Sequence, residues 1–204
     1  MGIAERKERQ KENLRREIFD AASELFAQEG YQNVSMRKIA ERIEYSPTTI
    51  YLYFKDKNEL LKYICEETFA ELGRRLRAVT EPEPDEIAGL KKGLRAYVDF
   101  GLENPYHYEV VINAPIFNQP HGDEYKYEGS LGEQTFEHLR AGVADCVAAG
   151  RLKKGDVDLM SQMLWAGVHG VVSLLNNHLD FPFVERDRLI DSMIDALVDG
   201  LNAK

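Results

Sequence analysis

Apolar residues recur at intervals of three and four along almost the whole chain, and no stretch alternates as a half-buried strand would. The clearest stripe runs from Leu14 to Phe26 and stops before Gly30, a residue type that commonly follows the last turn of a helix. The pattern therefore predicts an all-α fold of about nine helices.

Two short helices are predicted after the first. Ser35 is a suitable N-cap for the second helix, and Ser46 for the third, with Pro47 at its first helical position. Only Glu44-Tyr45 connects them. This layout is typical of a helix-turn-helix, whose second element enters the major groove of DNA.

The rest of the chain also has a helical period. Asp56 followed by Glu59 matches a capping box for a fourth helix, which ends before the EPEPDE stretch of residues 81–86. The polar segment 119–129 predicts a loop. The charged residues 1–13 could extend the first helix or contact a phosphate backbone, but a solvated, frayed end is favoured. The remaining helices are expected near residues 86–103, 106–118, 130–149, 156–179 and 185–202.

Charge is distributed unevenly along the 204 residues, whose net charge is −9. Residues 1–62 hold 12 Lys and Arg against 11 Asp and Glu, a net charge of +1, which leaves −10 on residues 63–204. A polyanion is therefore expected to dock on the N-terminal part, away from the acidic body.

Cellular location follows from the termini, the apolar runs and the cysteines. The N-terminus is charged throughout, unlike a signal peptide, and the longest apolar run, Met163 to Leu175, is shorter than the about 20 residues that span a bilayer. Cys65 and Cys146 form no CxxC pair. We therefore expect reduced thiols, a cytoplasmic location and no membrane partner.

The third predicted helix carries side chains suited to DNA. With Ile50 and Phe54 facing inward, hydroxyl-bearing residues and Leu52 occupy the opposite face, where they can reach phosphates, base edges or a thymine methyl group. Lys55 and Lys57 follow at the start of the next helix, where backbone amides favour a phosphate. Further positive charge on the preceding helix comes from Arg37, Lys38 and Arg42. An ordinary surface helix could explain any one of these residues, but their combination favours DNA binding.

Residues 14–61, LRREIFDAASELFAQEGYQNVSMRKIAERIEYSPTTIYLYFKDKNELL, resemble the DNA-binding region of the TetR family of bacterial transcriptional regulators. The resemblance runs through FAQEGY, SMRKIAERI and TTIYLYFKDKNELL. It implies an all-α homodimer with a helix-turn-helix DNA-binding domain, residues 1–60. It also implies an effector-binding and dimerisation domain, residues 61–204, that dimerises through the last two helices.

The family's DNA contacts map onto nine residues, with Tyr51 and Lys57 on phosphates. They are Ser35, Arg37, Pro47, Thr48, Thr49, Tyr51, Leu52, Tyr53 and Lys57. Two positions depart from the family pattern. Glu44 replaces the usual glycine, so the turn must form without glycine's freedom at positive φ. Leu52 stands where many members have an aromatic or polar residue. The implied partner is double-stranded DNA with a near-palindromic operator.

The C-terminal part contains a second, shorter resemblance. Residues 159–178, LMSQMLWAGVHGVVSLLNNH, are similar to a Trp…His-Gly signature of one TetR subgroup. Gly167 and Gly170 allow close approach by another helix. Trp165 and His169 either line an effector cavity or belong to the packed core, and the core interpretation is favoured.

Aromatic residues between helices suit a small-molecule effector that is partly apolar, although aromatic stripes more often form plain core and the sequence alone does not separate the two. The candidate effector-binding residues are Tyr97, Phe100, Tyr108, Phe117, Phe136, Trp165 and His169, with Tyr106 and Met163 as further cavity candidates. The apolar face of the last helix, Leu189 to Leu201, needs a cover, which its own core and a second copy can provide. A row of aspartates at spacing four (Asp187, Asp191, Asp195 and Asp199) predicts a solvated outer face rather than a metal site.

No enzyme is indicated. The sequence contains no HExxH, GxSxG or Walker loop, and Cys146 lies in the apolar context VADCVAAG, which favours an inert thiol. We expect no catalytic residue, metal or cofactor. The favoured function is a ligand-responsive repressor that a small molecule releases from its operator. The alternative is a helical interaction module that keeps a helix-turn-helix outline without binding DNA.

Overall fold

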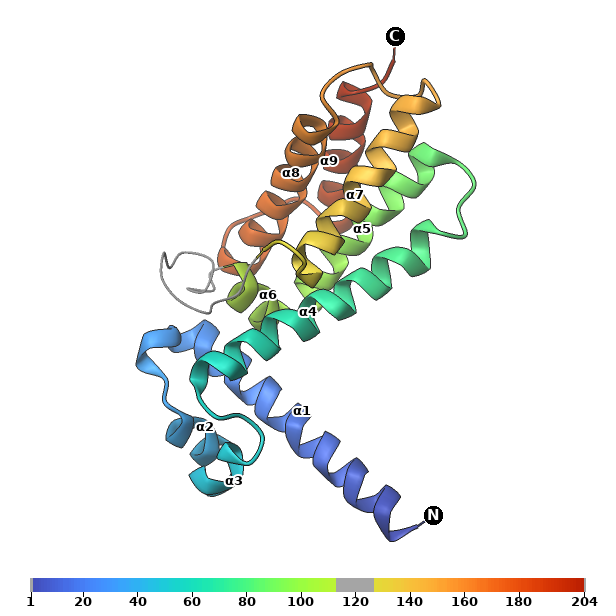
Figure 1. Ribbon diagram of the computed structural model, residues 1–204. Coiled ribbons are helices and arrows are strands. Elements are labelled where there is room, and N and C mark those ends of the chain that lie inside the picture. The colour runs from blue at the N-terminus through green and yellow to red at the C-terminus, as the bar shows by residue number, and fades with distance from the viewer. Residues whose placement is uncertain (1, 113–126, 204) are drawn as a thin grey trace. The chain divides into compact units, whose positions relative to one another are not determined.

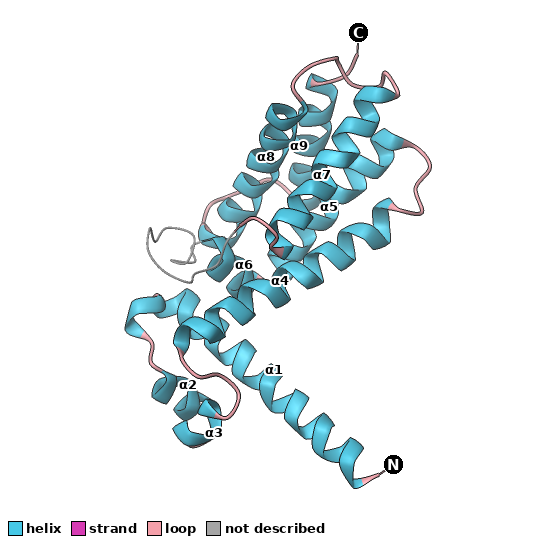
Figure 2. Ribbon diagram, viewed as in Figure 1, coloured by secondary structure: helices cyan, strands magenta, loops and turns pink. Residues whose placement is uncertain are grey.

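The computed structural model describes residues 2–112 and 127–203, apart from the side chains of Ile3 and Ala4. Every named element in these residues is helical (Figures 1 and 2), and an isolated β-bridge joins Leu152 to Asn202. The all-α prediction is confirmed, with nine α-helices in the described residues. They are α1 (Ile3–Glu29), α2 (Met36–Arg42), α3 (Pro47–Tyr51), α4 (Lys57–Thr80), α5 (Glu86–Glu103), α6 (Pro105–Ile112), α7 (Leu131–Ala148), α8 (Val157–Asn177) and α9 (Arg186–Gly200), with the 3-10 helix η1 (Tyr31–Asn33) after α1.

The chain divides into two compact units. The first comprises Met1–Thr68 and Tyr106–Tyr127, and the second comprises Phe69–Pro105 and Glu128–Lys204. Helix α4 runs from the first unit into the second, and α6 belongs with the helix-turn-helix. None of the helices in the described parts is long and apolar enough to cross a membrane.

The first unit is built on the inward stripe of α1. Ile18 of α1, Ile39 of α2, Ile50 of α3 and Leu61 of α4 are completely buried. Each such side chain contributes about 1.5–3 kcal/mol by leaving water. Phe54, which follows α3, is also buried, so the predicted inward direction of Ile50 and Phe54 is confirmed. The two short helices are therefore held by tertiary packing rather than by their own length.

The N-terminal end differs from the frayed segment that the charges predicted. Helix α1 begins at Ile3, and the backbone N–H of Gly2 donates to Oε2 of Glu5 across 2.8 Å. Glu5 and Arg9 are four residues apart, a spacing at which opposite charges support an exposed helix. The helical period therefore continues upstream of Leu14.

The capping of α4 is also partly different from the prediction. Oδ1 of Asp56 accepts the backbone N–H of Glu59 across 2.8 Å, as a capping residue should. The carboxylate of Glu59 does not reach back to Asp56 but accepts the N–H of Lys55 across 2.5 Å. Asp56 thus satisfies a donor that the first turn of α4 leaves free, and Glu59 satisfies one just before the helix.

The second unit packs α5, α7, α8 and α9 together with the end of α4, side by side in Figures 1 and 2. Its fully buried positions include Val98, Val143, Leu164 and Ile190, one from each of these four helices. A Cβ atom built on Gly167 of α8 would lie 2.4 Å from Cδ1 of Leu197. The predicted close approach of a helix is confirmed at Gly167, whereas a Cβ atom built on Gly170 would have no described atom of another element within 4 Å.

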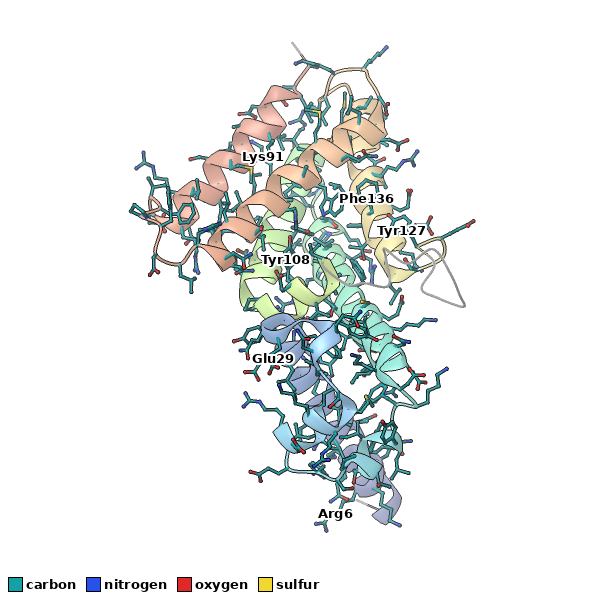
Figure 3. All side chains as sticks on the ribbon, turned by 90° about the vertical axis from the view of Figure 1, so that its left-hand side faces the viewer. Arg6, Glu29, Lys91, Tyr108, Tyr127 and Phe136 are labelled. Atoms are coloured by element: carbon teal, nitrogen blue, oxygen red, sulfur yellow. The ribbon has the colours of Figure 1, made fainter. Side chains whose placement is uncertain are left out.

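The aspartate row of α9 is not a purely solvated face. Arg95 of α5 donates to Asp187 and Asp191 across 2.8 and 2.7 Å, and Nζ of Lys91 lies 2.7 Å from Asp195. Lys91, whose label in Figure 3 lies over α9, is also 3.4 Å from Asp199. The row therefore fastens α9 to α5, a pairing between distant segments that sequence spacing could not reveal.

Candidate nucleic-acid interface

Each short helix of the helix-turn-helix begins at a serine that caps it. Oγ of Ser35 accepts the N–H of Lys38 across 3.2 Å, and Oγ of Ser46 accepts the N–H of Thr49 across 3.2 Å. The hydroxyls of Ser46 and Thr49 also lie 2.9 Å apart, and Pro47 occupies the first helical position. The sequence thus fixes where both helices start.

Glu44 itself takes the left-handed conformation in the turn between them. Its φ is 59°, and it is the one non-glycine with positive φ among the described residues. The turn is closed by the N–H of Tyr45, which donates to the carbonyl of Ala40 across 2.9 Å. The left-handed region costs a residue with a Cβ atom about 1–2 kcal/mol. The packing of α2 and α3 must supply that energy.

The outward face is polar and aromatic, with one leucine. Leu52 is 78% exposed and Tyr51 is 53% exposed, while Thr48 is also exposed. Tyr51 is the last residue of α3, so Leu52 caps its C-terminus and Tyr53 follows the helix. Most of this leucine side chain is therefore exposed to water rather than packed in the core of its own unit.

The remaining predicted contacts lie around this face. Ser35 and Arg37 are exposed, whereas Pro47, Thr49 and Tyr53 are half-buried. The three cations of α2 each lie against a glutamate: Arg37 against Glu41, Lys38 against Glu29 and Arg42 against Glu24. The glutamate partners of Lys38 and Arg42 lie on another helix, so the sequence does not reveal them, whereas Glu41 stands four residues after Arg37 in the sequence.

Lys57 is held by backbone carbonyls. Its ammonium donates to the carbonyl of Tyr31 across 2.6 Å and to that of Val34 across 2.8 Å. It also lies 4.2 Å from the ring centroid of Tyr31. Burial lowers the pKa of Lys57. An ammonium has three N–H donors, so one of them is left after these two bonds.

A groove in the first unit escaped sequence analysis. It has a volume of about 410 Å³ and lies between α1, α6 and the end of α2. His107 stacks on Phe19 with ring centroids 4.6 Å apart, and its Nε2 lies 3.3 Å from a carboxylate oxygen of Asp20. Nothing in the local pattern near residue 107 indicated that this segment would pack on α1.

Four of the seven effector candidates come together in the second unit. Nε1 of Trp165 donates to Oη of Tyr97 across 3.0 Å. The ring of Trp165 lies 6.0 Å from that of Phe136, which is labelled on α7 in Figure 3, and 6.2 Å from that of His169. Trp165 is 41% exposed. The core interpretation favoured for Trp165 is therefore wrong for this side chain.

The other three candidates do not join this group. Phe100 is buried in a core cluster with Leu72 and Leu76. Tyr108 is buried in α6, within the first unit. Phe117 lies outside the described residues. Of the further candidates, Tyr106 accepts a hydrogen bond from Gln28 across 3.2 Å and Met163 is exposed on α8.

Neither cysteine shows the features of a nucleophile. Both are buried free thiols. Burial is the main reason that the pKa of Cys65 rises to about 12 and that of Cys146 to about 11. Among the described residues, no three His, Cys, Asp or Glu side chains converge as metal ligands would.

Two capped helices joined by a tight left-handed turn, with a polar face turned outward, define a helix-turn-helix protein that binds DNA. Comparison with known families narrows the class. Residues 18–64 match the model of bacterial regulatory proteins of the tetR family. Residues 90–197 match that of the tetracyclin repressor-like C-terminal domain. The chain therefore belongs to the TetR family of helix-turn-helix transcriptional regulators, which are not enzymes.

Individual relatives agree with this assignment. The chain is 26% identical over 192 residues to a fatty acid metabolism regulator protein of Bacillus subtilis strain 168, covering 92% of this chain and 95% of the relative. It is 42% identical over 60 residues to an uncharacterized HTH-type transcriptional regulator of Haemophilus influenzae, a match that covers 29% of this chain and 32% of the relative. The fold is similar to that of a TetR family transcription regulator from Marinobacter aquaeolei VT8. That match has a TM-score of 0.80 and 18% identity, and it covers 97% and 100% of the two chains.

Proposed function

We propose that this protein is a repressor that a small molecule releases from a near-palindromic operator. The observation that carries the proposal is the outward face of α3, where Thr48, Tyr51 and Leu52 are exposed beside the capped start of the helix. A homodimer would present two such faces to successive major grooves. In this proposal residues 1–60 read DNA and residues 61–204 bind the effector and dimerise in the cytoplasm.

Two kinds of DNA contact are proposed. Base edges are read by Thr48, Thr49, Leu52 and Tyr53. Contacts to the sugar-phosphate backbone, which fix the register on the DNA, are made by Ser35, Arg37, Pro47 and Tyr51. Lys57 is proposed to contact a phosphate with the N–H that its two carbonyl bonds leave. The same ammonium therefore orders the start of α4 and binds DNA.

The experiment is selection from random duplex DNA with the wild type and with the double variant Thr49→Ala, Tyr53→Ala. Enrichment of a palindrome by the wild type alone supports reading by α3. If a folded, dimeric wild type enriches nothing, the alternative of a module that does not bind DNA becomes the better account.

Homodimerisation through α8 and α9 is proposed from an exposed apolar stripe. Leu159, Met163 and Leu174 are all about half exposed and fall on one face of α8. Such a stripe marks an interaction surface when it is long and continuous. Met163→Glu should convert the dimer to monomers in sedimentation velocity. Gln134→Glu, which adds the same charge at an exposed position of α7, should leave the dimer intact.

The effector is proposed to bind beside Trp165, Tyr97, Phe136 and His169, as the Trp…His-Gly subgroup assignment would also suggest. The aromatic surfaces favour a partly apolar molecule. The name of the Bacillus subtilis relative makes fatty-acid derivatives the first compounds to screen. Phe100, Tyr108 and Phe117 remain secondary candidates.

Trp165 is the only tryptophan of the chain, so its fluorescence reports on this site directly. A true effector should change the emission of Trp165 and release labelled operator DNA over the same concentration range. Phe136→Ala should weaken both responses together while leaving operator affinity without ligand unchanged. A compound that releases DNA without touching the emission would place the effector elsewhere.

A further inference from the structure

The three cations of α2 are held in two different ways. Arg42 makes two hydrogen bonds to Glu24 of α1, across 2.8 and 2.7 Å, and Lys38 is paired with Glu29, also of α1 and labelled in Figure 3. These two pairs join separate helices. Breaking either one would loosen the attachment of α2 to α1.

Arg37 is different because its partner lies on the same helix. Nε of Arg37 is 2.9 Å from Oε1 of Glu41, one turn further along α2. The side chains are 79% and 61% exposed. The pair joins no two elements, and an ion pair this exposed stabilises the fold only weakly. Of the three cations, Arg37 alone can turn to a phosphate without undoing packing between α1 and α2.

We propose that Glu41 is an affinity-limiting residue that competes with DNA for Arg37. In the free protein Arg37 is paired with Glu41, and on DNA it exchanges this carboxylate for a phosphate. Glu41 is then left unpaired beside the polyanion, and its charge opposes binding. The inference rests on the proposed function, since it requires that α2 and α3 bind duplex DNA.

The expected consequence is a trade of affinity for selectivity. Phosphate contacts carry no sequence information, so a carboxylate that weakens one of them lowers binding to operator and random DNA alike. With this phosphate contact weakened, a larger share of the total affinity comes from the base contacts of α3. Glu41 thus tunes how much of the binding free energy is independent of sequence.

The test measures operator and random-duplex affinity by fluorescence anisotropy over a range of salt concentrations. Glu41→Gln should tighten binding to both DNAs by about two- to fourfold. This gain exceeds what loss of the exposed Arg37–Glu41 ion pair alone would give, because the repulsion between Glu41 and DNA is also removed. The salt dependence should steepen by up to about 0.9, the slope of one phosphate contact. Glu67→Gln, which removes one charge from exposed α4 in the same unit, is the matched control and should have a smaller effect.

A double-mutant cycle separates competition from the simple loss of a negative charge. In an Arg37→Ala background, Glu41→Gln should give a clearly smaller gain in affinity than in the wild type, because the cation for which it competes is absent and only its repulsion of DNA is removed. An equal gain with and without Arg37, or no gain at all, would overturn the proposal. If the wild type binds and enriches DNA while Glu41→Gln has no effect, only this inference fails. If the wild type binds no DNA, the proposed function fails first.

Discussion

Arg95 on α5 donates to Asp191 on α9 across 2.7 Å, although 96 residues separate them in sequence. The same guanidinium bonds Asp187 and, within α5, Asp99. Partial burial alone would lower the pKa of Arg95, but the hydrogen bonds to Asp99 and Asp191 raise it overall. One arginine therefore neutralises carboxylates that would otherwise repel one another.

Arg95→Met should lower the free energy of unfolding by about 1–2 kcal/mol, because three carboxylates lose their shared cation. Urea denaturation of the full chain measures it. The loss should shrink in 1 M NaCl, which screens the repulsion that remains. Arg188→Met, which removes a cation from the exposed first turn of α9, should cost much less. Equal costs for the two variants would mean that the Arg95 bonds add nothing specific.

Gly167 sets the distance between α8 and α9. Alanine would normally gain about 1 kcal/mol in a helix interior, but its Cβ atom would meet Cδ1, Cδ2 and Cγ of Leu197 at 2.4–3.3 Å. Overpacking of this kind costs about 1–3 kcal/mol. Gly167→Ala should therefore lower the melting temperature. Gly142→Ala, on α7 with no atom within 4 Å, should raise it or leave it unchanged.

The turn at Glu44 offers a stabilising substitution. Glycine takes φ of 59° without the clash that a Cβ atom suffers, so Glu44→Gly should raise the free energy of unfolding by about 1 kcal/mol. Glu44→Gln removes the charge but keeps the Cβ atom, and thermal denaturation should find it close to wild type. A gain in Glu44→Gln as large as in Glu44→Gly would attribute the effect to charge rather than to backbone strain.

The two thiols should be silent in the folded protein. Because burial raises the pKa of Cys65 to about 12 and that of Cys146 to about 11, the thiolate form is scarce below pH 9. Thiolate reactivity should therefore rise only above that pH, on the alkaline side of an ordinary cysteine. Titration with a chromogenic disulfide at pH 8 should give no rapid signal from native protein and two thiols after denaturation. Rapid native labelling of either cysteine would contradict its burial.

Local chemistry explains why the helix-turn-helix could be predicted. Helix starts depend on nearby residues: the side chains of Ser35 and Ser46 bond backbone N–H groups three residues on, and Pro47 fits the first helical position. The spacing of Ile50 and Phe54 is enough to identify the inward face. The conformation of Glu44 followed less directly. The missing glycine indicated an unusual turn, but only the structure gave the left-handed backbone.

The frayed end was a wrong prediction and the solvated aspartate row was an incomplete one, because both rested on composition; the aspartates stay more than half exposed but are ion-paired. Charged residues at the start of α1 support a helix when opposite signs stand one turn apart. The aspartates of α9 meet Arg95 and Lys91, which lie about 100 residues away in the chain. Composition does not reveal which charges will be neighbours.

The sequence by itself determined the helical period, the caps and the side chains on α3, because each depends on residues within one or two turns. Tertiary structure alone decided which partners these side chains contact. It tied Lys57 to two carbonyls, joined Trp165 to Tyr97 and sent Phe100 into a core. Those relations depend on distances between elements far apart in the chain, and packing sets such distances, not spacing.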